Sequence, residues 1–165
     1  MKVYLDISEI SNKTGAISYV FPANIEIIPT GTTISAMSIQ DNNKDYRLYA
    51  EKHDLQFIFE DNIPAIDFYA VPQLDIFALD NKGGMLATLG AATDINELTK
   101  PICYISNNRD CFTIADNLNQ FMQMIATQKE WRLNMKNTKN ISIYSSKSEA
   151  EQKVNFFKFQ NTNAK

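Results

Sequence analysis

The sequence is short of the features that most directly reveal a function. No apolar run approaches the roughly 18 residues that a membrane-spanning helix needs. Residues 1–13 carry acidic side chains where a signal peptide would be apolar. We therefore expect a cytoplasmic protein without a membrane partner.

Cysteine and histidine are scarce as well. Cys103 and Cys111 are the only cysteines, and one pair at this spacing forms neither a zinc site nor a disulfide framework, so both are predicted to be reduced thiols near the core. His53 is the only histidine, so a Ser-His-Asp or Cys-His catalyst, or a histidine metal site, would have to use it. Its position on the apolar side of a predicted helix favours a packing or hydrogen-bonding role.

Two common motifs of catalytic and phosphate-binding sites are missing. There is no G-x-S-x-G motif for a serine nucleophile. Residues 82–84, Lys-Gly-Gly, lack the frame of a phosphate-binding loop and link two predicted strands, so they are predicted to form a turn. No cofactor and no metal are expected.

The chain does contain enough apolar material to fold. Its 165 residues are 44% hydrophobic and include 10 Phe and 7 Tyr, which suits one globular domain with a buried core. We expect a single domain over residues 1–160 and a frayed tail over residues 161–165.

The central feature is a hairpin within residues 68–90. Residues 74–79 run out, residues 80–84 turn with the help of Gly83 and Gly84, and residues 85–89 run back. The outgoing strand is apolar on both faces, as expected for a strand that is covered on both sides. Residues 102–105 and 111–114 predict a second hairpin, and short links favour an antiparallel meander that also includes residues 66–71.

Further elements flank these hairpins. Weaker strand patterns lie at residues 2–7, 17–21, 25–28, 56–59 and 141–144. Apolar positions at helical spacing predict three helices: one over residues 46–53, one from a capping-box-like start at Thr113 and Asp116 to residues 130–133, and one after the capping box of Ser146 and Glu149. Together they predict an α+β fold, with a mostly antiparallel sheet packed by a few helices.

Charge is unevenly distributed along the chain. Residues 41–97 hold eleven acidic and four basic residues, a balance of −7, whereas residues 100–165 hold five acidic and ten basic residues, a balance of +5. An acidic surface attracts a basic protein and repels nucleic acid, so a basic partner is favoured and a nucleic acid is not.

Several of these segments resemble the SUKH superfamily, which includes fungal regulators of cell-wall glucan synthesis and many bacterial proteins. The resemblance lies in residues 68–72, 76–80, 83–84, 101–106 and 114–121, within a region of about residues 56–130. The first forty residues depart from the family pattern. The resemblance implies a SUKH-like α+β fold and a non-enzymatic, protein-binding role. Many bacterial members are similar to immunity proteins that neutralise a polymorphic toxin.

We therefore expect a protein-interaction module. The resemblance implies the more specific role of an immunity protein, whose partner is a protein such as a basic toxin domain. The predicted contact residues are five carboxylates around the hairpin and one aromatic anchor: Glu60, Asp61, Asp67, Asp75, Asp80 and Tyr69. The alternative is a hydrolase or metal-dependent enzyme that uses His53 and nearby carboxylates. A scaffold subunit of a larger complex is a third possibility, and the oligomeric state is left open.

Overall fold

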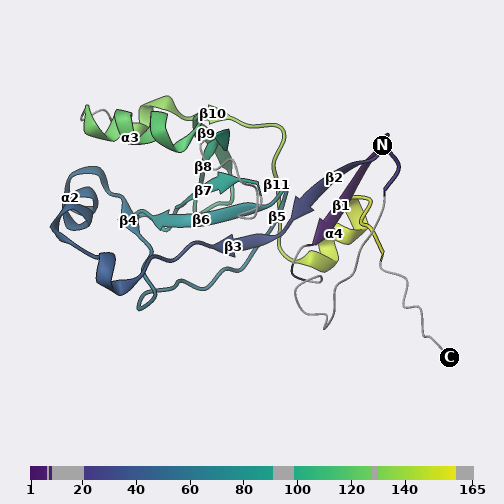
Figure 1. Ribbon diagram of the computed structural model, residues 1–165, viewed down its shortest axis with the longest axis horizontal. Coiled ribbons are helices and arrows are strands. Elements are labelled where there is room, and N and C mark those ends of the chain that lie inside the picture. The colour runs from purple at the N-terminus through teal and green to yellow at the C-terminus, as the bar shows by residue number, and fades with distance from the viewer. Residues whose placement is uncertain (7, 9–20, 91–98, 128–129, 159–165) are drawn as a thin grey trace.

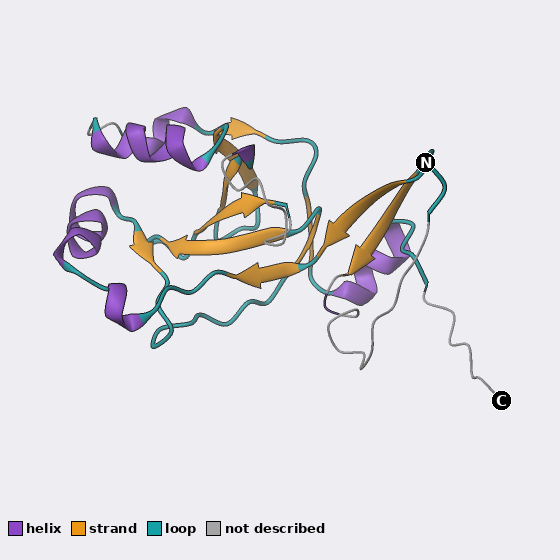
Figure 2. Ribbon diagram, viewed as in Figure 1, coloured by secondary structure: helices purple, strands orange, loops and turns teal. Residues whose placement is uncertain are grey.

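The computed structural model describes residues 1–6, 8, 21–90, 99–127 and 130–158, and it has the predicted α+β architecture (Figures 1 and 2). The central sheet is ordered β10 (Lys136–Asn137), β9 (Cys111–Ala115), β8 (Ile102–Ile105), β7 (Met85–Leu89), β6 (Leu74–Leu79) and β3 (Thr32–Ile34), with β4 (Gln56–Phe57) also paired to β6. Every pairing in this sheet is antiparallel except that of β3 with β6. The predicted antiparallel meander is confirmed for β6 to β9.

The hairpin that joins β6 and β7 forms as predicted. The N–H of Asp80 donates to the carbonyl of Gly84 at 3.1 Å, and Gly83 adopts a φ of +80°. Glycine tolerates this left-handed conformation without steric cost, which is why the short turn can close. Residues 82–84 therefore serve the turn.

Strand β6 is the centre of the sheet because both of its edges are occupied. One edge pairs with β7 along its length, with a bulge between Ile76 and Ala78. The other edge is shared: Leu74 to Ile76 pair in parallel with β3, and Ala78 and Leu79 pair antiparallel with β4. Two segments that are more than 20 residues apart in the sequence thus pair with successive parts of the same edge of β6.

The sheet is covered by apolar side chains on both faces. In β8, Ile102 and Tyr104 point to one face, whereas Cys103 and Ile105 point to the other, as the two-residue period of a strand requires. The first, which we name the helical face, packs against α3 (Leu118–Ala126) and the 3₁₀ helix η3 (Trp131–Asn134). The second, the loop face, packs against Ile58, Phe68 and Ile141. Each fully buried aliphatic side chain contributes about 1.5–3 kcal/mol.

A smaller group of elements lies beside the sheet at the N-terminal end of the chain (Figure 1). Strand β1 (Lys2–Asp6) pairs in parallel with β2 (Glu26–Thr30), and Tyr4 exchanges backbone hydrogen bonds with the segment after α4 (Lys147–Lys153). Strand β5 (Tyr69–Val71) pairs with β11 (Ser142–Tyr144).

The expectation that residues 66–71 join the meander was wrong, because β5 pairs with β11 and not with β6. The predicted strand at residues 17–21 and the predicted tail lie outside the described residues, apart from Phe21.

All three predicted helices form; α2 (Lys44–His53) begins two residues before its predicted start, and α4 begins at its predicted capping box, Ser146 and Glu149. Helix α2 follows the 3₁₀ helix η1 (Ile39–Asp41). Helix α3 does not begin at Thr113, because that residue belongs to β9. Its N-cap is Asn117, whose side chain accepts from the N–H of Gln120 at 2.8 Å. It ends at Ala126, and residues 131–134 form the separate η3. None of the helices in the described ranges has the length and apolar character to cross a bilayer.

We predict that Gly84→Ala destabilises the protein by about 1–3 kcal/mol, as overpacking of a buried site does. A Cβ at this position would lie 2.2 Å from the Tyr104 hydroxyl, which is held by a hydrogen bond to Asp80. Urea denaturation measures the loss. The matched control Lys82→Ala, at an exposed position of the same turn, is expected to stay within about 0.5 kcal/mol of the wild type. Equal stability of Gly84→Ala and wild type would contradict the packing.

Candidate functional site

The six predicted contact residues do not share one surface. Glu60, Asp61 and Asp67 are exposed, and Tyr69 is half-buried. Asp75 and Asp80 are only 8% and 6% exposed. The expectation that these two aspartates face a partner is therefore corrected: both carboxylates are bound within the chain itself.

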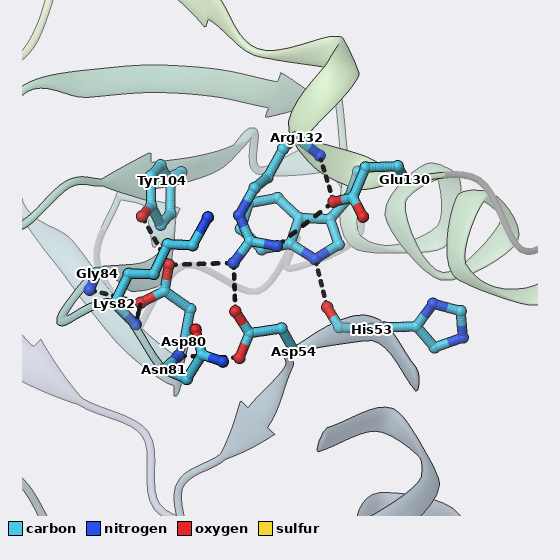
Figure 3. A network of polar contacts seen from close by, with 10 residues as sticks. His53, Asp54, Asp80, Asn81, Lys82, Gly84, Tyr104, Glu130 and Arg132 are labelled. Carbon is cyan, nitrogen blue, oxygen red and sulfur yellow. Dashed lines mark hydrogen bonds and ion pairs between the residues drawn. The ribbon is translucent and has the colours of Figure 1, made fainter. Parts of the chain in front are cut away.

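Asp80 is the acceptor at the centre of a polar network beneath the β6–β7 turn (Figure 3). One of its oxygens accepts from the backbone N–H groups of Lys82 at 2.9 Å and Gly84 at 2.6 Å. The other accepts from the Tyr104 hydroxyl at 2.6 Å and from Arg132 at 3.2 Å. Four donors on a buried carboxylate satisfy it and hold the turn against β8 and η3.

Arg132 links this turn to helix α2. The same guanidinium nitrogen that reaches Asp80 also donates to Asp54 at 2.5 Å, and Asp54 in turn accepts from the N–H of Asn81 at 2.9 Å. The guanidinium lies 4.1 Å from the ring centroid of the buried Trp131, in a cation–π contact. Trp131 itself is fully buried in the core of the helical face.

The network sets the ionisation of its members. Burial by itself raises the pKa of Asp80, but hydrogen bonds from Tyr104, the turn and Arg132 outweigh it, so the pKa lies below its usual value. Burial and the bond to Asp80 raise the pKa of Tyr104 to about 12. Asp80 is therefore an anion and Tyr104 a neutral donor at physiological pH, which is the combination that the hydrogen bond needs.

His53 lies beside this network but does not join it through its ring. Its backbone carbonyl accepts from the indole N–H of Trp131 at 2.8 Å. The imidazole points away from Asp54 and Asp80 (Figure 3) and lies against Tyr49. Within the described ranges, no three His, Cys, Asp or Glu side chains are grouped so that they could hold a metal ion. The geometry therefore gives no specific support to the alternative of a hydrolase or metal-dependent enzyme built on His53.

Tyr69 takes part in a second polar cluster, between β1, β5 and α4. Its hydroxyl donates to Asp6 at 2.8 Å and lies 2.8 Å from the hydroxyl of Thr30. Lys147 is 3.3 Å from the same carboxylate of Asp6. Burial raises the pKa of Asp6, but hydrogen bonds from Ser8 and Tyr69 and the charge of Lys147 lower it to a value below the usual one. The predicted aromatic anchor thus joins the N-terminal strand to the rest of the chain.

Several of the acidic side chains of residues 41–97 are neutralised by the basic C-terminal part. Arg132 pairs with Asp54 and Asp80, and Arg109 pairs with Asp67. The uneven charge of the sequence is thus partly cancelled by contacts in the fold. An acidic surface can be formed only by the carboxylates that have no such pair.

Four exposed carboxylates gather at one corner of the molecule, which we name the acidic corner: Asp41, Asp45, Glu60 and Asp61. The two segments that carry them are joined where the N–H of Glu60 donates to the carbonyl of Met37 at 3.0 Å. A shallow hollow of about 230 Å³ is lined by residues of both, among them Tyr46 and Asp61.

The acidic corner also has an apolar component. Ile39 and Ile63 are 51% and 55% exposed, an unusual state for isoleucine. Glu60 and Asp61 were predicted as contact residues, whereas Asp41 and Asp45 were not. The sequence gives no sign that Asp41 and Asp45 lie beside Glu60 and Asp61, because the two segments are brought together by tertiary contacts such as that of Glu60 with Met37.

The geometry stands without support from known proteins, because the chain matches no protein-family model, no curated protein and no solved structure. The resemblance to the SUKH superfamily remains a prediction from the sequence.

We predict that Arg132→Met costs about 2–4 kcal/mol of unfolding free energy, because it leaves the buried Asp80 and the half-buried Asp54 without their cation. Arg132→Lys keeps the charge and should lose less, although it cannot keep the geometry of the planar guanidinium. Denaturant titration measures both variants. Arg47→Met, at an exposed position of α2, is the control and should change stability by less than about 0.5 kcal/mol. If both Met variants behaved alike, the network would have no stabilising role.

The lowered pKa of Asp80 also predicts a pH dependence. A carboxyl group with a depressed folded-state pKa stabilises the protein above the unfolded value, near 3.8, and this stabilisation is lost as the pH falls through the folded value. Between pH 7 and pH 3, the unfolding free energy of Asp80→Asn should therefore fall less steeply than that of the wild type. Urea titrations at the two pH values test this. Parallel curves would show that Asp80 is not a source of the acid sensitivity.

Proposed function

We propose that the protein is a non-enzymatic interaction module that binds a basic protein through the acidic corner. The observation that supports this proposal is that four exposed carboxylates, Asp41, Asp45, Glu60 and Asp61, lie on two adjoining segments that also carry the exposed Ile39 and Ile63. Exposed isoleucines beside a charged rim are typical of a protein-binding surface.

The charge of the corner favours a cationic partner. Lys44 and Arg47 are also exposed there, so the four carboxylates leave a net charge of −2. Such a field raises the association rate with a basic surface and lowers it with nucleic acid. Because the Debye length is about 8 Å at physiological ionic strength, binding through exposed charges should weaken as salt is added.

The role that we propose for this binding is neutralisation of a toxin. It is supported by the resemblance of the β6–β7 hairpin and the segment up to α3 to the SUKH superfamily, whose bacterial members include proteins similar to immunity proteins. The partner would then be a basic toxin domain, and the acidic corner would cover its functional surface.

The test uses the basic protein domains encoded next to the gene for this chain, each purified and titrated against it by biolayer interferometry. Wild type should bind one of them, with an affinity that falls as salt rises. The triple variant Asp45→Lys, Glu60→Lys, Asp61→Lys should bind about 100-fold more weakly, since reversal of three contact charges costs several kcal/mol and each 1.4 kcal/mol is a factor of ten. If that domain is toxic when expressed, wild type should restore growth and the triple variant should not.

A matched control reverses three exposed carboxylates elsewhere: Glu26→Lys, Asp110→Lys, Asp116→Lys. It changes the net charge by the same amount and should bind within about threefold of the wild type, because its charges lie outside the corner. Equal losses in the two triple variants would indicate a nonspecific effect of charge. Unchanged binding by the corner variant would contradict the proposed surface.

A further inference from the structure

We propose that the protein has a second binding site, a small cavity on the helical face that accepts an uncharged, ring-sized molecule with one hydrogen-bonding group. The cavity is distinct from the hollow of the acidic corner, although Phe57 lines both. It is lined by residues of β4, β6 and β7, by the segment after β3, by Lys100 and by the first residue of α3.

The walls of the cavity are mostly apolar. Phe57 and Phe77 lie with ring centroids 5.9 Å apart, and Met37 and Leu118 complete the apolar lining. Phe77 also contacts Phe121 of α3 edge-on, at 6.3 Å, which holds its ring in place. An aromatic or cyclic ligand would find ring faces and a flexible thioether to pack against.

The size of the cavity limits the ligand. Its volume is about 180 Å³. A cavity of about 150 Å³ accommodates benzene, whereas drug-sized ligands occupy roughly 300–1,000 Å³. A single six-membered ring with a small substituent therefore fits, and a nucleotide or a peptide does not.

Two buried charged residues line the same space, and they have opposite signs. Asp75 is 8% exposed and Lys100 is 5% exposed, although most residues of these types lie at the surface. The Thr33 hydroxyl donates to Asp75 at 2.8 Å, and both Asp75 and Lys100 also take part in further interactions within the chain. Thr88, which pairs with Asp75 across β6 and β7, adds a hydroxyl to the lining.

This arrangement selects against a charged ligand. A cation would be attracted by Asp75 and repelled by Lys100, and an anion would be attracted by Lys100 and repelled by Asp75. In either case the net electrostatic attraction is too small to offset the free energy that the ion loses with its hydration shell. A neutral hydroxyl or amide costs much less to desolvate than a charged group, and a hydrogen bond to the lining offsets that cost. The polar groups therefore orient the ligand, and the apolar walls supply most of the affinity.

The experiment uses three probes that share a 4-fluorophenyl ring and differ in the charge of a small substituent: 4-fluorophenol, 4-fluorobenzoate and 4-fluorobenzylamine, titrated with the full chain and followed by ¹⁹F NMR at pH 7. We expect 4-fluorophenol to bind with a dissociation constant of roughly 1 mM, a value suited to so small a ligand. The two charged probes should bind at least tenfold more weakly. Tighter binding of either charged probe, or no binding of the phenol, would overturn the proposal.

A blocking variant places the binding in this cavity. Ser35 lies at the rim and is exposed, so Ser35→Phe adds a ring at the mouth without removing a core contact. It should weaken phenol binding by at least tenfold. Ser142→Phe introduces the same ring at an exposed serine of β11 and should leave binding unchanged. Equal binding by Ser35→Phe and wild type would show that the probe binds elsewhere.

A pair of charge variants tests why the site prefers a neutral ligand. Asp75→Asn removes the negative charge that repels an anion from the lining, so 4-fluorobenzoate should gain at least fivefold in affinity relative to the wild type. Lys100→Gln removes the positive charge that repels a cation, so 4-fluorobenzylamine should gain instead. Circular dichroism confirms that each variant is folded before titration. If neither variant gained for its probe, the balance of the two charges would not be the source of selectivity. If a variant did not fold, the decision would rest on the probe series and Ser35→Phe.

Discussion

Strand β6 has hydrogen-bonded neighbours along both edges and apolar side chains packed against both faces, and this enclosure constrains the rest of the chain. A strand in this position must be bounded by turns whose polar groups are also satisfied. Asp80 does this at one end, where its carboxylate receives the N–H groups of the turn. Asp75 accepts a hydrogen bond from Thr33 of β3 near the other end. Both aspartates belong to the architecture of β6.

The fold also redistributes the charge that the sequence separates. Arg132 comes from the basic C-terminal part and reaches two carboxylates that precede it by more than 50 residues, Asp80 and Asp54. Since the guanidinium also lies on Trp131, the same side chain connects η3, the β6–β7 turn and the end of α2. Ion pairs of this kind leave fewer unpaired acidic side chains than the composition suggests, and four of the exposed ones lie at the corner formed by η1, the start of α2 and the segment after β4.

The proposed protein-binding corner and the proposed cavity follow from different parts of this arrangement. The acidic corner consists of exposed carboxylates that form no ion pair with the described residues of the C-terminal part, and it lies beside the N-terminal end of α2. The cavity lies where the edge strands β3 and β4 meet β6 beside the start of α3, and its lining includes one buried carboxylate and one buried ammonium. One surface is suited to a large charged partner and the other to a small neutral molecule, so the two can be tested separately.

The local pattern of the sequence was sufficient for the α+β class, the β6–β7 and β8–β9 hairpins, helix α2 and the capping box of α4. These elements depend on residues within a few positions of one another, through two-residue or helical periodicity and glycine in the turn. The start of α3 was misplaced because Thr113 continues β9, and its capping potential was overridden by pairing with β8.

Which carboxylates are exposed could not be read from the sequence either. Asp75, Asp80 and Tyr69 were taken for contact residues, but their side chains bond to partners from β3, η3 and β1. Only the tertiary structure decided that the two aspartates are buried and Tyr69 half-buried, whereas Glu60 and Asp61 stay at the surface. Burial of a charge depends on whether distant donors reach it, and that distance is set by the packing of the whole chain.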